Sequence, residues 1–159
     1  MAERNIHPEN PTFKIRDYSI TYPPNWLQIL YTKLGFELFD LTIVKMGNIS
    51  DDPTFISHTL GAYPCLAGAA IEKNGNGIYI FHTFSVDLPK KLIELVNKGT
   101  IDGGIVGGRR ETYNWDVFKK FFESVNIDYV PPLENSRQSF AVLSEPSTKS
   151  IFYTYDANN

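Results

Sequence analysis

The sequence predicts an α+β fold in which mixed β-sheets, with one central hairpin, pack against helices in a layered sandwich. Three segments have helical periodicity, several others alternate or run continuously apolar, and the turns favour hairpins over regular βαβ units. The chain has 159 residues, about the length of one domain. We therefore expect a single domain over residues 1–159.

The first third of the chain is predicted to contain a loose arm, a helix and a strand. The first ten or so residues, with Pro8 and Pro11, are typical of an arm. After Pro23-Pro24, apolar residues recur at helical spacing from Trp26, and Gly35 can end that helix. The run "FELFDLTIVKM", residues 36–46, then predicts a strand, and "TFISHT", residues 54–59, a short extended stretch.

Residues 65–84 carry the clearest local pattern, that of a β-hairpin. The runs "CLAGAAIEK" and "GIYIFHTF" flank two Asn-Gly pairs, a strong signal for a hairpin turn. Both faces of both runs are apolar, so we expect these strands to be central. The only cysteine, Cys65, begins the first run, and His82 lies in the second.

The second half is predicted to add two helices and three strands. Asp87 can cap a helix that has Leu92 and Val96 on its apolar face and Gly99 just past its end. After the glycine-rich "IDGGIVGG", a second helix is expected in "TYNWDVFKKFFESV", residues 112–125. Strands are expected at "IDYV", "SFAVLS" and "SIFYTY", the last two joined by the turn "EPSTK".

Composition and charge disfavour several function classes. The net charge of −3 comes with no block of like charge, so nucleic-acid binding is not expected. One cysteine allows no internal disulfide, and with three scattered histidines it is too few for a structural zinc site. No segment approaches roughly 18 apolar residues, and no signal-peptide pattern is visible. We expect no membrane insertion and a cytoplasmic protein, or one exported without a cleaved signal.

The hairpin register decides whether Cys65 and His82 share a site. If Asn74-Gly75 closes the loop, Cys65 faces Phe84, and His82 lies on the same face, one diagonal step away. Diagonal neighbours are roughly 7–8 Å apart, within reach of an imidazole that bends toward a thiol. A loop closed at Gly75-Asn76 keeps the face but loses the contact.

Two plainer interpretations compete with a Cys65–His82 site. A lone buried cysteine is more often structural than catalytic. His58, next to Thr59, is an alternative base, whereas His7 in the arm is expected to be a surface residue. The hairpin geometry adds modest support to His82 as the partner of Cys65, and both interpretations stay open.

The segment "TLGAYPC", residues 59–65, with His82 following 17 positions after Cys65, resembles the active-site pattern of the chemoreceptor glutamine deamidases of the CheD family. That pattern is Thr-Leu-Gly, three residues, Cys, and a hairpin that returns a His. The likeness covers roughly residues 54–155, a CheD-like core, and leaves residues 1–50 as an N-terminal extension that is a candidate for substrate recognition. Bacterial toxins resembling cytotoxic necrotizing factor share this architecture.

The resemblance implies deamidation of a glutamine in a partner protein, with release of ammonia and no metal or cofactor. Cys65 would attack the carboxamide, and His82 would carry the thiol proton to the departing ammonia. Thr59 would accept a hydrogen bond from the other ring nitrogen of His82. Water would hydrolyse the thioester to glutamate. The partner would be a chemoreceptor, or a host protein if the chain is a toxin or effector delivered into a host cell.

The chain departs from the family pattern in two places. Tyr63-Pro64 replaces Gly-Ser before the cysteine, and proline has no N–H to donate to an oxyanion. Arg109-Arg110 replaces Arg-Asn. The alternative is therefore a catalytically decayed deamidase fold that acts as a protein-binding module. A papain-like protease is a weaker third option, because its cysteine normally begins a long helix. The sequence does not indicate an oligomeric state.

Overall fold

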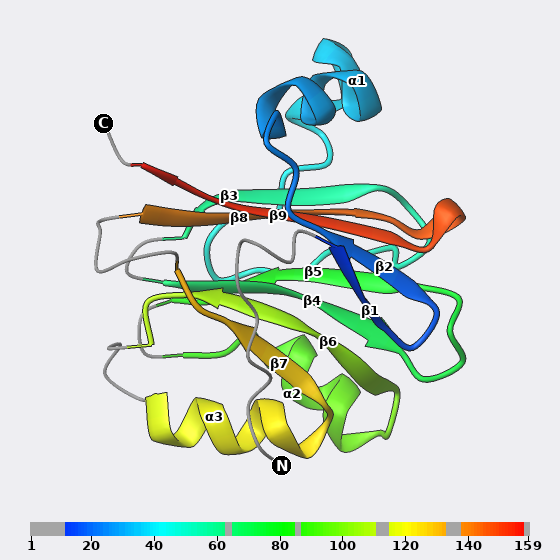
Figure 1. Cartoon of the computed structure of the whole chain (residues 1–159). Helices are drawn as coiled ribbons and strands as arrows, with labels where there is room; N and C mark the ends of the chain where they lie inside the picture. The colour runs from blue at the N-terminus through cyan, green and yellow to red at the C-terminus, as the bar shows by residue number, and fades with distance from the viewer. Residues whose placement is uncertain (1–11, 63–64, 85–86, 111–114, 133–137, 158–159) are drawn as a thin grey trace.

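Two β-sheets stacked face to face form the centre of the fold, with helices on both outer sides (Figure 1). The computed structural model describes residues 12–62, 65–84, 87–110, 115–132 and 138–157. Residues 1–11, with the predicted arm and His7, lie outside the described residues, as does Tyr63-Pro64. The predicted α+β fold is confirmed: the sheets have five and four strands.

The five-stranded sheet combines the N-terminal strands with the last two strands of the chain. In spatial order it contains β1 (Thr12–Ile15), β2 (Tyr18–Thr21), β9 (Ser150–Ala157), β8 (Gln138–Glu145) and β3 (Ser57–Ala62). β2 runs parallel to β9, and the other neighbours are antiparallel. Residues 12–21 are therefore part of the five-stranded sheet.

The four-stranded sheet contains the predicted hairpin. Its order is β5 (Ile78–His82), β4 (Leu66–Glu72), β6 (Ile101–Gly108) and β7 (Ile127–Val130). β4 is central, as predicted, whereas β5 is the edge strand, and backbone hydrogen bonds from Gly47 and Ser50 cover that edge. β6 and β7 are parallel, and the chain crosses between them through α3 (Trp115–Ser124).

The alternation of side chains along the hairpin builds two separate cores. Ala69, Ile71 and Ile80 belong to the cluster between the two sheets, together with Phe140 of β8. The intervening residues face the other way, into a cluster with side chains of α2 (Lys90–Asn97) and α3. Figure 1 shows both helices below the four-stranded sheet. The predicted apolar character of both hairpin faces thus follows from burial on both sides.

The strand predicted for residues 36–46 is wrong. Helix α1 (Trp26–Phe39) continues past Gly35, whose φ of 66° makes a kink where the sequence predicted an end. The Thr42 N–H still donates to Leu38 O at 3.0 Å, a helical hydrogen bond. Phe36 is 85% exposed, so the alternating apolar pattern of this segment is not matched by burial in a sheet.

Other local predictions are corrected in part. Asp87 does not cap α2, because the helix begins at Lys90 with Pro89 at its N-cap and without a side-chain cap. Gly99, with a φ of 73°, follows the end of that helix as predicted. Strands β1, β2 and β6 have no counterpart in the prediction, and β6 is the glycine-rich segment itself.

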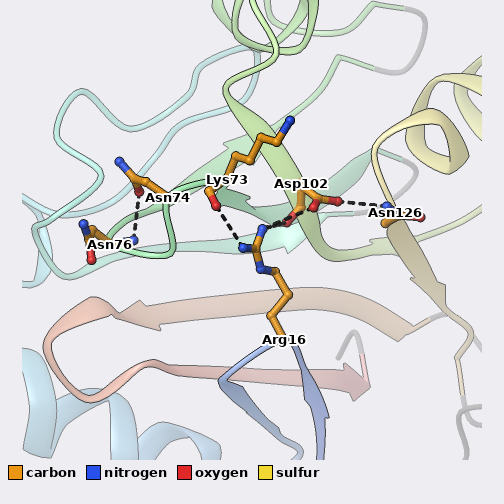
Figure 2. Close-up of polar contacts among 6 residues, drawn as sticks. All are labelled: Arg16, Lys73, Asn74, Asn76, Asp102 and Asn126. Atoms are coloured by element: carbon orange, nitrogen blue, oxygen red, sulfur yellow. Dashed lines mark hydrogen bonds and ion pairs between the residues drawn. The ribbon is translucent and has the colours of Figure 1, made fainter.

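Arg16, in the turn between β1 and β2, joins the two sheets (Figure 2). Its guanidinium donates to the Lys73 carbonyl at 2.8 Å and to the Asp102 carbonyl at 3.1 Å. Asn126 donates to the Asp102 carboxylate at 2.8 Å. These contacts fix the turn end of the β4–β5 hairpin, opposite the end that carries Cys65 and His82.

Candidate functional site

The β4–β5 hairpin has the tighter of the two predicted registers. Ala67 pairs with His82 and Ile71 with Ile78, and Gly75 has the positive φ that the turn requires. Cys65 lies directly before β4, and His82 is the last residue of β5. The register thus places Cys65 one diagonal step from His82.

Thr59 belongs to the facing sheet, where it lies directly before a β-bulge. Thr59 pairs with Val142 and Ala62 with Phe140, so β3 has one more residue than β8 between these pairs. Gly61 has a φ of 69°, a conformation that glycine adopts without strain. The Thr-Leu-Gly sequence therefore has a structural reason: it contains the bulge, and Gly61 supplies the positive φ there.

The hydroxyl of Thr59 links His82 to the backbone of Val44. Thr59 Oγ1 lies 2.7 Å from His82 Nδ1 and 2.6 Å from Val44 O. A carbonyl only accepts, so the single hydroxyl proton is donated to Val44, and His82 Nδ1–H is the donor to Thr59. The neutral ring then keeps its lone pair on Nε2. This is the tautomer that a general base needs, because Nε2 is free to accept a proton.

Cys65 is held by a different contact. Its Sγ donates to the Met46 Sδ at 3.3 Å, and the side chain is 5% exposed. Among the described residues, the hydrogen bonds of the site do not include one between Cys65 and His82. The structure thus brings Thr59 and His82 together, and the hairpin register places Cys65 one diagonal step from His82. The predicted approach of the sulfur to a His82 ring nitrogen stays a prediction.

Burial keeps both reactive groups uncharged. It lowers the pKa of His82 and raises the pKa of the Cys65 thiol. The Cys65 backbone N–H lowers the pKa of the thiol, but by less than burial raises it. At neutral pH the pair is therefore a thiol and a neutral imidazole, and proton transfer must accompany attack on a substrate.

His58, the alternative base, is occupied elsewhere. Its Nδ1 lies 3.0 Å from the Thr42 hydroxyl, and the ring packs against Phe39 at 4.8 Å between centroids. It is fully buried, and burial lowers its pKa to about 4. As the strand neighbour of Thr59, it lies on the opposite face of β3, toward α1. His82 is therefore the better-placed base.

The backbone around the hairpin end limits the donors available to an oxyanion. The Leu66 N–H donates to Thr83 Oγ1 at 3.1 Å, so it is already used. The N–H of Cys65 remains the candidate donor among the described neighbours of the thiol, since Tyr63-Pro64 lies outside them.

Sequence reasoning missed Val44 and Met46. Both lie in the segment predicted as a strand, and Met46 is 19 positions from Cys65. No motif in the sequence connects them to the site. They are brought there because the segment runs beside β3 and then along the edge of β5, where the Gly47 N–H donates to the His82 carbonyl at 2.6 Å.

The arginine pair also lies close to the site, just beyond the end of β6. Gly108 pairs with Leu66, next to Cys65, and the guanidinium of Arg110 lies 5.5 Å from the centre of the Tyr129 ring. Arg137, which also belongs to the part of the chain that resembles the CheD family, lies outside the described residues. Within the described part of the chain, no three His, Cys, Asp or Glu side chains are grouped to hold a metal ion.

The site belongs to a two-sheet α+β protein with a buried histidine, threonine and cysteine at one end of a hairpin. No family model, curated protein or solved structure matches the chain. The resemblance to the CheD family thus rests on the residues of the motif. None of the helices in the described ranges has the length and apolar content needed to cross a membrane.

Proposed function

We propose that this protein is a cysteine hydrolase that converts a glutamine side chain of another protein into glutamate and releases ammonia. The observation that carries the proposal is the hydrogen-bond chain from Val44 through Thr59 to His82. These hydrogen bonds leave Nε2 of His82 as an unprotonated base, one diagonal step along the hairpin from Cys65, the only thiol in the sequence.

In the proposed reaction, His82 Nε2 takes the Cys65 proton while the sulfur bonds to the glutamine carbonyl carbon. The proton then passes to the nitrogen, the carbon–nitrogen bond breaks, and ammonia leaves. Water adds to the thioester, with His82 as the base, and the sulfur leaves to restore the thiol. The sum is glutamine plus water to glutamate plus ammonia, which requires no redox partner.

The recessed position of the reactive groups favours a side chain as the substrate. Cys65 and His82 are each 5% exposed, so a folded backbone cannot lie directly against them. A glutamine carboxamide at the end of a flexible two-carbon stem can reach such a site. This supports deamidation of a protein side chain over cleavage of a main-chain peptide bond.

The second candidate is a protein-binding module on the same scaffold, and one observation favours it. Catalytic cysteines usually have a lowered pKa, whereas burial raises the pKa of Cys65. Under this alternative, Cys65 and Met46 are simply packed together, and the protein binds a partner without altering it.

Mass spectrometry of candidate substrates separates the two candidates. Chemoreceptors and host-cell proteins are incubated with the protein or with Cys65→Ala, and peptides are searched for one glutamine converted to glutamate, with ammonia measured in parallel. Conversion that requires Cys65 supports the hydrolase. Stable binding of a partner without conversion, equal for both proteins, would support the binding module.

A further inference from the structure

The contact between Met46 and Cys65 bears on how a substrate reaches the thiol. Met46 Sδ lies 3.3 Å from Cys65 Sγ, and residue Met46 is 51% exposed while Cys65 is 5% exposed. The thioether thus lies on the solvent side of the thiol. A reagent approaching from that side meets Met46 first.

The backbone that carries Met46 is held in place on both sides. The Asn48 N–H donates to Lys45 O at 3.0 Å, which closes a β-turn with Met46 and Gly47 at its centre. Gly47 has the φ of 86° that a type II turn requires at this position. Its N–H donates to the His82 carbonyl. The turn is therefore anchored to the strand that carries the candidate base.

The Met46 side chain, in contrast, is only partly enclosed by the fold. Half of it faces solvent, and an unbranched thioether with three rotatable bonds adapts to different neighbours at low cost. The hydrogen bond from a thiol to a thioether is weak, so its loss opposes such a movement only slightly. An anchored turn that carries a half-exposed, adaptable side chain in contact with a buried thiol has the properties of a cover.

We propose that Met46 is a movable cover that controls access to Cys65 and thereby selects what reaches it. In the closed position it shields the sulfur from water and bulky reagents. When the side chain swings outward, it opens a path wide enough for a slender, unbranched group. That this group is a glutamine side chain rests on the proposed function, whereas the cover itself does not.

The rate of alkylation of Cys65 tests the cover directly, because Cys65 is the only thiol in the chain. Native protein is treated with iodoacetamide at about pH 8, and the modified fraction is followed by intact-protein mass spectrometry. Met46→Ala removes the cover, and Met46→Leu keeps its bulk without the sulfur. Leu41→Ala is the matched control, since Leu41 is a 79% exposed apolar residue of the same segment.

We expect alkylation to be about tenfold faster in Met46→Ala and within about threefold of the wild type in Met46→Leu and Leu41→Ala. An unchanged rate in Met46→Ala overturns the proposal, as does a rate in Met46→Leu that equals that of Met46→Ala. Met46→Phe, which enlarges the cover, should react more slowly than the wild type. It keeps the test decisive if the alanine variant does not fold.

The outcome is independent of the proposed activity. If alkylation responds as expected but no glutamine is converted in any substrate, the cover stands and the hydrolase proposal fails. If glutamine is converted but alkylation does not depend on residue 46, the hydrolase stands and the cover fails.

Discussion

At the scale of single residues, the Thr59 hydroxyl has a role that a side chain without a hydroxyl cannot fill. It accepts from His82 Nδ1 and donates to Val44 O, while being completely buried. A side chain without a hydroxyl would leave two buried polar groups without partners. The contact between Thr59 and His82 was predicted from the spacing of the motif, but the Val44 carbonyl that orients the hydroxyl was not.

Thr59→Val should therefore reduce turnover through the orientation of His82. The substitution keeps the shape of the side chain but removes the acceptor for Nδ1–H, at a cost in stability of about 1–3 kcal/mol. Thr59→Ser, which keeps the hydroxyl, is the control. Nitrogen NMR of the ring should find the Nδ1-protonated tautomer in the wild type and in Thr59→Ser, and a mixture of tautomers in Thr59→Val.

The loss of turnover in Thr59→Val should be smaller than in Cys65→Ala or His82→Ala, because misorienting a base is less damaging than deleting it. A single unchanged tautomer in Thr59→Val would contradict the role assigned to the hydroxyl. Equal losses in all three variants, with folding intact by circular dichroism, would mean that the hydroxyl contributes more than its orienting role explains.

His58 should make the stability of the protein depend on pH. Burial lowers its pKa from 6.5 to about 4, and the nearby Asp40 opposes this shift only in part. Because the unfolded chain binds more protons between these two values, the free energy of unfolding falls as the pH drops from 6.5 toward 4. The loss amounts to about 3 kcal/mol.

Urea unfolding at several pH values measures this dependence. His58→Asn, which cannot titrate but can still donate to the Thr42 hydroxyl, should flatten most of the slope. His82→Asn is the matched variant. It should remove a further part of the pH dependence of the free energy of unfolding, since burial also lowers the pKa of His82. An unaltered slope in His58→Asn would contradict the assignment.

At the scale of elements, prediction succeeded where a local rule determined the structure. The Asn-Gly turn and the period of two specify the β4–β5 hairpin and its register, including the pairing of Ala67 with His82. β6 was missed because four of its residues in "IDGGIVGG" are glycines, which are depleted in strands. Its position is determined by close contacts with β4, which the sequence does not reveal.

Gly104 of β6 should be intolerant of any side chain. Its φ is 143°, and an added Cβ would overlap the Ala69 carbonyl oxygen of β4. Gly104→Ala should reduce the free energy of unfolding by about 2–5 kcal/mol through overlap and backbone strain. Gly99→Ala is the matched control, because Gly99 also has a positive φ but open space around it. It should cost about 1 kcal/mol. If thermal unfolding shows equal losses of stability in Gly104→Ala and Gly99→Ala, the close approach of Gly104 to Ala69 is not the cause.

At the scale of the whole molecule, the site depends on segments from both sheets and from the N-terminal third. Thr59 comes from the five-stranded sheet and His82 from the four-stranded sheet, while Val44 and Met46 come from a connecting segment. The spacing of the motif predicted Thr59 and His82 as site residues, because both lie on predicted extended segments near Cys65 in the sequence. It could not predict the connecting segment, whose path depends on the kink in α1 and on the open edge of β5.

Cys65→Ser separates the chemistry of the site from the packing of the fold. A thiol and a hydroxyl are similar in shape, so Cys65→Ser should change the free energy of unfolding by only about 1 kcal/mol. The melting temperature measures this change. The serine hydroxyl is much harder to ionise, and a histidine oriented by a neutral threonine activates it weakly, so deamidation should fall by orders of magnitude.

The most direct test of the central claim is to measure glutamine-to-glutamate conversion and melting temperature on the same preparations of wild type and Cys65→Ser. If Cys65 is the nucleophile, the melting temperature stays nearly unchanged and conversion is almost completely lost. If Cys65 were only a core residue, the hydroxyl would cost roughly 1–3 kcal/mol of stability, and any activity would weaken only through unfolding. A destabilised variant that still converts glutamine at the wild-type rate would contradict the claim that Cys65 is the nucleophile.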